Sequence, residues 1–98
     1  MTLDEIMQDI QACQEDLLTH ERKYGVLSET FYESYISGEE PADDAWVLDW
    51  SDWAGTYEIW RDRQQQYHKV INALKQSLSL SQIIERTARR EPLPIPAS

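Results

Sequence analysis

Apolar side chains recur at the spacing of one helical face along most of the chain, and no segment alternates with the two-residue period of a strand. In the first segment these positions are Leu3, Ile6, Met7, Ile10, Cys13 and Leu17. Thr2 and Glu5 have the spacing of a capping box, in which each side chain satisfies a free amide of the first turn. Gly25 suits the left-handed residue that ends many helices. The pattern predicts a first helix over about residues 3–23.

A shorter helix is predicted over about residues 28–37. Its apolar face consists of Phe31, Tyr32, Tyr35 and Ile36. Ser28 is expected to cap its first turn, and Gly38 is expected to end it. Pro41 cannot continue a helix, so a turn is expected there, and Asp43 or Asp44 then opens the next element.

The longest regular pattern in the chain contains all four tryptophans. Its members are spaced alternately four and three residues apart: Trp46, Trp50, Trp53, Tyr57, Trp60, Gln64, Tyr67, Ile71, Leu74 and Leu78. We call these ten positions the seam. Such a sustained alternation is typical of the contact face of a coiled coil, so it predicts one helix over about residues 44–78. The tryptophans are therefore interpreted as core or interface residues rather than as a platform for a ligand.

The expected helix lengths indicate how the domain assembles. At 1.5 Å per residue the long helix would span about 50 Å and the first helix about 30 Å. A hairpin of the two would leave part of the seam exposed, and large exposed apolar patches mark association. The expected fold is all-α. It is an antiparallel helical hairpin with a short middle helix, and it dimerises into a two-fold helical bundle through the seam from Trp50 to Leu78.

Three features outside this frame leave alternatives open. Gln64 either fixes the register of the dimer or faces solvent where the seam leaves the bundle. A second apolar stripe of the long helix, formed by Leu48, Ile59 and Val70, is covered by the middle helix in part and otherwise binds a partner. Residues 1–78 make the single domain. Residues 79–98 are expected to form a short helix capped by Ser81 and a flexible proline-rich tail, which either frays or wraps a partner.

The net charge of −9 is unevenly distributed along the 98 residues. Residues 1–58 carry −13 and residues 59–98 carry +4. A front half this acidic repels phosphate backbones, so the protein alone is not expected to bind nucleic acid, and a basic protein partner is favoured. The most accessible charges are Glu39, Glu40, Asp43 and Asp44, which lie in a turn and at a helix start. The alternative is that the charge only keeps the surface soluble.

The residue pattern does not favour catalysis, a cofactor or a metal. Neither His20 nor His68 has the glutamate three positions earlier that a helical di-iron site requires. Cys13 lies on the apolar face of the first helix and is interpreted as a small core residue. A single cysteine, an N-terminus unlike a signal peptide and the lack of a membrane-spanning apolar run together predict a cytoplasmic protein.

Residues 24–60 resemble a set of small prokaryotic all-helical proteins that are often encoded beside a toxin and are regarded as antitoxin-like. The matching positions are Tyr24, Gly25, Ser28, Glu29, Phe31, Gly38, Glu39, Asp43, Asp44, Trp53, Tyr57 and Glu58. Trp46, Trp50 and the proline-ending tail depart from the pattern. The resemblance implies a helical fold and a protein partner.

Two functions are therefore expected to compete. The first is a non-catalytic protein-binding module, antitoxin-like, that neutralises a basic partner. Its predicted binding residues are Glu39, Glu40, Asp43, Asp44, Leu48, Ile59 and Val70. The alternative is a self-assembling structural helical protein with no toxin-related role.

Overall fold

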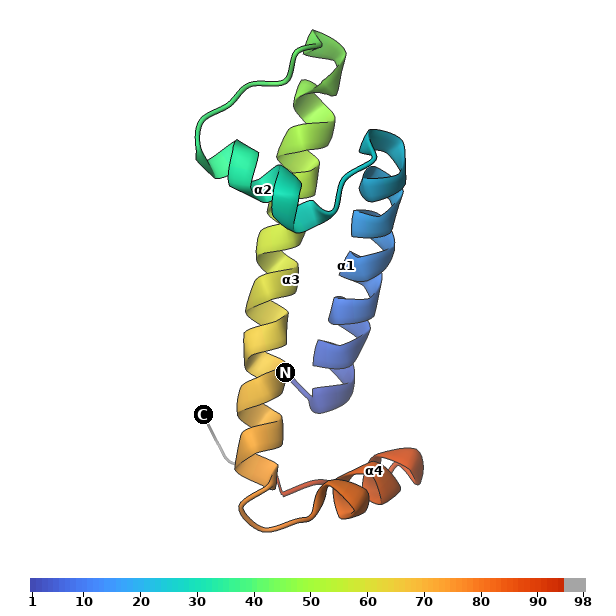
Figure 1. Ribbon diagram of the computed structural model, residues 1–98. Coiled ribbons are helices and arrows are strands. Elements are labelled where there is room, and N and C mark those ends of the chain that lie inside the picture. The colour runs from blue at the N-terminus through green and yellow to red at the C-terminus, as the bar shows by residue number, and fades with distance from the viewer. Residues whose placement is uncertain (95–98) are drawn as a thin grey trace.

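The computed structural model describes residues 1–94, and its helices confirm the all-α fold class (Figure 1). α1 (Leu3–Tyr24) and the long α3 (Val47–Leu74) pack side by side and run in opposite directions. α2 (Ser28–Ile36) crosses the upper part of α3, and α4 (Leu80–Ala88) lies across its lower end. The molecule is elongated, with extents of 51 × 23 × 19 Å.

α1 begins and ends for local reasons. The Glu5 amide donates to Thr2 Oγ1 at 3.1 Å, but the return bond from the Glu5 side chain is not formed within residues 1–94. Only half of the predicted capping box is therefore present. Gly25 has a φ of +79° and donates its amide to the Glu21 carbonyl at 2.8 Å. This left-handed conformation is strained for a residue with a side chain, so the glycine ends the helix.

The long helix is shorter at both ends than the seam predicted. A 3₁₀ turn, Asp44–Trp46, precedes α3, and Asp43 caps it by accepting the Ala45 amide at 2.9 Å. At the other end α3 stops at Leu74. α4 is capped by Ser79 in a full capping box with Gln82, so the predicted cap at Ser81 was wrong.

Two buried clusters occupy the two ends of the α1–α3 interface. The upper cluster buries Leu17, Phe31, Trp53 and Ala54, with Trp50, Tyr57 and Trp60 packed against it. The lower cluster buries Leu3, Leu74 and Ile83, with Tyr67, Ile71, Leu78 and Leu93 packed against it. Most seam residues thus contact the interior of the same chain, and Gln64 is half-buried.

The exposed overhang that motivated a dimer through the seam is not found in residues 1–94. Among the ten seam residues, only Trp46 counts as an exposed large apolar side chain, with 36% of its surface accessible. Phe31 of α2 covers the upper part of the seam, and Ile83 of α4 covers the lower part. The overhang was predicted from the lengths of two helices alone, whereas the short helices α2 and α4 close both ends. Dimerisation itself stays a prediction.

Candidate functional site

Trp53 is the centre of the upper cluster and is only 1% exposed. Its ring stacks on Phe31 with centroids 3.9 Å apart and planes 3° from parallel. The rings of His20 and Tyr24 lie at 5.5 Å from it. Its indole Nε1 donates to Ser28 Oγ at 2.9 Å, so the polar edge is satisfied as well. This tryptophan is fully used by the fold and leaves no face for a ligand.

Ser28 does not cap α2 as predicted, because it is the first residue of the helix and is buried. Its amide and its hydroxyl both donate to Glu21 Oε2, each at 2.8 Å. The carboxylate of Glu21 therefore takes the place of the cap, where the positive end of the helix dipole favours it. Leu27 occupies the N-cap position and makes no side-chain cap bond. A chain of hydrogen bonds thus links Glu21, Ser28 and Trp53.

Asp49 joins the end of α1 to the start of α3. Its Oδ2 accepts hydrogen bonds from Lys23 Nζ and, at 2.7 Å, from the Tyr24 hydroxyl. These two bonds, that from Lys23 first, hold the pKa of the Asp49 carboxyl below its ordinary value. Burial, followed by the bond to Asp49, raises the pKa of the Tyr24 hydroxyl. The cluster fixes the entry of α3 against α1.

The lowered pKa of Asp49 predicts a specific acid sensitivity. A carboxyl whose folded pKa lies below its unfolded value stabilises the fold above about pH 4, and this contribution is lost as the pH falls through the folded pKa. In Asp49→Asn we expect a smaller drop in the urea midpoint between about pH 6 and about pH 3 than in the wild type. Asp16→Asn, at an exposed position, is the matched control. If the urea midpoint of Asp49→Asn fell as far as the midpoints of the wild type and of Asp16→Asn, the assignment would be contradicted.

The side chains that could take part in chemistry, a histidine and the cysteine, are held by the packing of the fold. His20 Nε2 lies 3.0 Å from Asp52 Oδ2, and the histidine side chain is 12% exposed. Burial, followed by the charges of Asp16 and Asp9, raises the pKa of the Cys13 thiol and so disfavours the nucleophilic thiolate. Among residues 1–94, no three His, Cys, Asp or Glu side chains lie close enough together to hold a metal ion.

The loop between α2 and α3 carries the four acidic residues predicted to bind a partner: Glu39, Glu40, Asp43 and Asp44. We call them the acidic tip. All four are exposed, and no ion pair within the described residues involves any of them. Two have local roles, since Glu39 accepts the Ser34 hydroxyl at 2.8 Å and Asp43 caps the 3₁₀ turn.

The predicted apolar stripe is only partly present on the surface. Leu48 is 83% exposed and Ile59 is 50% exposed. Val70, however, is half-buried and packs against the lower cluster, so it presents little surface to a partner. A helical wheel places it close to the other two, but it contacts the lower cluster, to which α1, α3 and α4 each contribute one buried residue. Val47, beside Leu48 and 49% exposed, was missed because it lies outside both apolar patterns.

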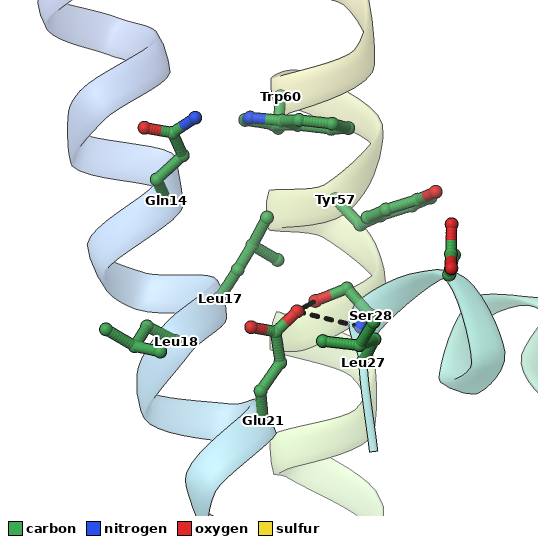
Figure 2. Close-up of a pocket in the computed structure, with 9 residues that line it drawn as sticks. Gln14, Leu17, Leu18, Glu21, Leu27, Ser28, Tyr57 and Trp60 are labelled. Atoms are coloured by element: carbon green, nitrogen blue, oxygen red, sulfur yellow. Dashed lines mark hydrogen bonds between the residues drawn. The ribbon is translucent and has the colours of Figure 1, made fainter.

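A groove of about 400 Å³ opens between α1, the start of α2 and α3 (Figure 2). Leu17, Tyr57 and Trp60 form its apolar base. Leu18 and Leu27 line it as well, and they are 42% and 61% exposed. The charged lining residues are Glu21 and Glu29. We call this feature the α1–α2 groove. It was missed because its residues come from three helices with no common sequence pattern.

Comparisons of the chain with protein-family models, with curated proteins and with solved structures find no match. Within residues 1–94, each helix falls short of the length or the apolar character needed to cross a membrane.

Proposed function

We propose that this protein is a non-catalytic binding module for a basic protein partner, and that the acidic tip is the first point of contact. The observation that carries the proposal is the lack of cations around the tip. Asp9, Asp49 and Asp52 each have a Lys, Arg or His within 3.0 Å. The four carboxylates of the tip have none within residues 1–94, and although other single carboxylates are also unpaired, the tip brings four of them together in one short exposed loop. A concentrated, uncompensated charge of this kind attracts a partner of opposite sign.

The surroundings of the tip support a protein partner rather than a small cation. Val47 and Leu48 follow the tip after two residues and are exposed, as is Ile36 before it, at 65%. Protein interfaces commonly combine an apolar centre with a polar rim. The resemblance of residues 24–60 to antitoxin-like proteins agrees with this reading and suggests that the partner is a toxin. In this proposal the protein alone does not bind nucleic acid, because its front half repels phosphate.

The test is a kinetic one. The tagged protein is used to recover a stoichiometric basic partner, and both rate constants are then measured by surface plasmon resonance. A variant with Glu39→Gln, Glu40→Gln, Asp43→Asn and Asp44→Asn should fold normally, because Asn caps a helical turn about as well as Asp. We expect its association to be slower by about tenfold or more at low salt, because exposed charges act mainly on the rate of encounter.

A second variant controls for net charge. It removes four exposed carboxylates away from the tip: Glu5, Glu15, Asp16 and Glu91. Its association should slow much less, because only the tip carboxylates face the partner. Equal slowing of both variants would show that overall charge, and not the tip, steers the encounter. Unchanged rates in both would overturn the assignment of this surface.

Self-association is the competing proposal, and Leu48 with Ile59 favours it. Eleven residues separate them, so they lie on one side of α3 about 16 Å apart. A second copy would cover this exposed side, since the seam is already packed within one chain. Recovery of only further copies of the chain, with a dimer in sedimentation equilibrium, would favour a homodimer over the basic partner.

A further inference from the structure

We infer that the α1–α2 groove is a second docking site, which takes a bulky apolar side chain from a cationic segment of a partner protein. The groove shares no residue with the acidic tip, so the inference stands apart from the proposed function.

Exposed apolar side chains line the groove. Leu27 stands at the N-cap of α2, a position where Ser, Thr, Asp or Asn would supply a cap bond. Leucine supplies none, and most of its side chain is exposed. Leu18 lines the groove from α1 and is also exposed. The fold gains little from either leucine, whereas an inserted apolar side chain would be enclosed between them and Trp60.

The charge that lines the groove is negative. Of the residues that the structure describes, no Lys or Arg lines the groove, and both charged residues that do are glutamates. Ser28 bonds to Oε2 of Glu21, while Oε1 points into the groove and accepts no bond from the described residues (Figure 2). Glu29 forms no ion pair within residues 1–94. An occupant that carries Lys or Arg beside its apolar side chain would pair with both carboxylates.

One hydrogen-bond donor beside the groove is unpaired within the described residues. Trp60 Nε1 is buried and has no hydrogen-bond partner within the described residues. It points toward the side of the groove where Gln14 lies (Figure 2). Leaving a buried donor unpaired is unfavourable, and a backbone carbonyl is the acceptor that every peptide segment carries. Apolar side chain, cation and carbonyl together describe a peptide segment of basic sequence.

The probe for the test is a short amphipathic peptide built from Leu and Lys, with a counterpart that has Glu in place of every Lys. The four tryptophans give four indole proton signals in NMR, which Trp→Phe variants assign. At physiological salt we expect the Lys peptide to shift the Trp60 signal saturably and to leave the Trp46 signal unchanged. Equal binding of the Glu peptide would overturn the inference, because the two glutamates of the groove would then not select a cationic occupant.

Three variants locate the site. Leu27→Lys should weaken binding of the Lys peptide by about tenfold or more, because it removes an apolar wall and adds a like charge. Leu80→Lys makes the same chemical change at an exposed leucine of α4, outside the groove and the acidic tip, and should leave the affinity unchanged. The four-residue variant of the acidic tip should also keep its affinity.

If the tip variant loses binding and Leu27→Lys keeps it, the peptide docks at the tip and the groove assignment is wrong. A Trp60 shift that depends on protein concentration alone would make a second copy the occupant, and would equally overturn it.

Discussion

Replacing Trp53 by alanine is expected to lower the free energy of unfolding by about 3–5 kcal/mol. The indole is 1% exposed and stacks directly on Phe31, so its removal leaves a large cavity between α2 and α3. The cost adds the lost transfer of the ring out of water to the contacts that its neighbours lose. Urea denaturation of the wild type and the variant measures the difference.

Two variants separate the contributions at this site. Trp53→Phe keeps an aromatic ring against Phe31 but loses the bond to Ser28 Oγ, so it should cost only about 1–2 kcal/mol. Trp46→Ala, at a tryptophan with 36% of its surface accessible, should cost about 1 kcal/mol or less. If Trp53→Ala were no more destabilising than Trp46→Ala, the upper cluster would not be the core of the protein.

Replacing Leu74 by alanine is expected to cost about 3 kcal/mol, the second largest effect. Leu74 is 1% exposed and packs with Leu3 of α1 and Ile83 of α4, so it connects three helices. Leu80→Ala, on the exposed side of α4, is the matched control and should change stability by about 0.5 kcal/mol or less. The free energies come from urea denaturation as before.

The same experiment tests whether α4 belongs to the core. Ile83→Ala alone should also destabilise, and the double variant should cost less than the sum, because the two side chains share one contact. Strict additivity, together with a small effect of Ile83→Ala, would indicate that α4 detaches in solution. A chain truncated after Ser79 would lose α4 and uncover Leu3 and Leu74, so we expect this deletion to lower the stability as well.

The sequence predicted the parts of the fold whose causes are local. The start of α1 at Thr2 and its end at Gly25 depend on residues within a few positions of each other. The seam correctly anticipated a long helix packed against the first. It overestimated the continuity of that helix, because periodicity shows which side chains face the interior and not whether the backbone bonds run unbroken. Trp46 contacts Tyr24 edge-on from a 3₁₀ turn, outside α3.

The parts that were missed depend on contacts between distant residues. Ser28 has the sequence appearance of a cap, but its partners Glu21 and Trp53 come from other helices. The exposure of the seam could not be judged without knowing where α2 and α4 pack. One missed feature, the cap of α4, could have been predicted from the sequence, since Ser79 and Gln82 have the spacing of a capping box. Of the candidate surfaces, the acidic tip was named from sequence, while the α1–α2 groove needed three helices in place.

The elongated shape of the molecule would let it bind two partners at once without steric conflict. The acidic tip lies at one end of a 51 Å rod, while the N-terminus and α4 lie toward the other end (Figure 1). α4 and the residues just after it carry Arg86, Arg89 and Arg90, but Arg89 pairs with Glu85 and Arg90 with Asp4, so the charges at this end are largely compensated while those of the acidic tip are not. Two partners bound at these ends, each narrower than the rod is long, would not touch each other, and neither would block the other's binding. A support attached at the N-terminus would therefore leave the acidic tip facing outward.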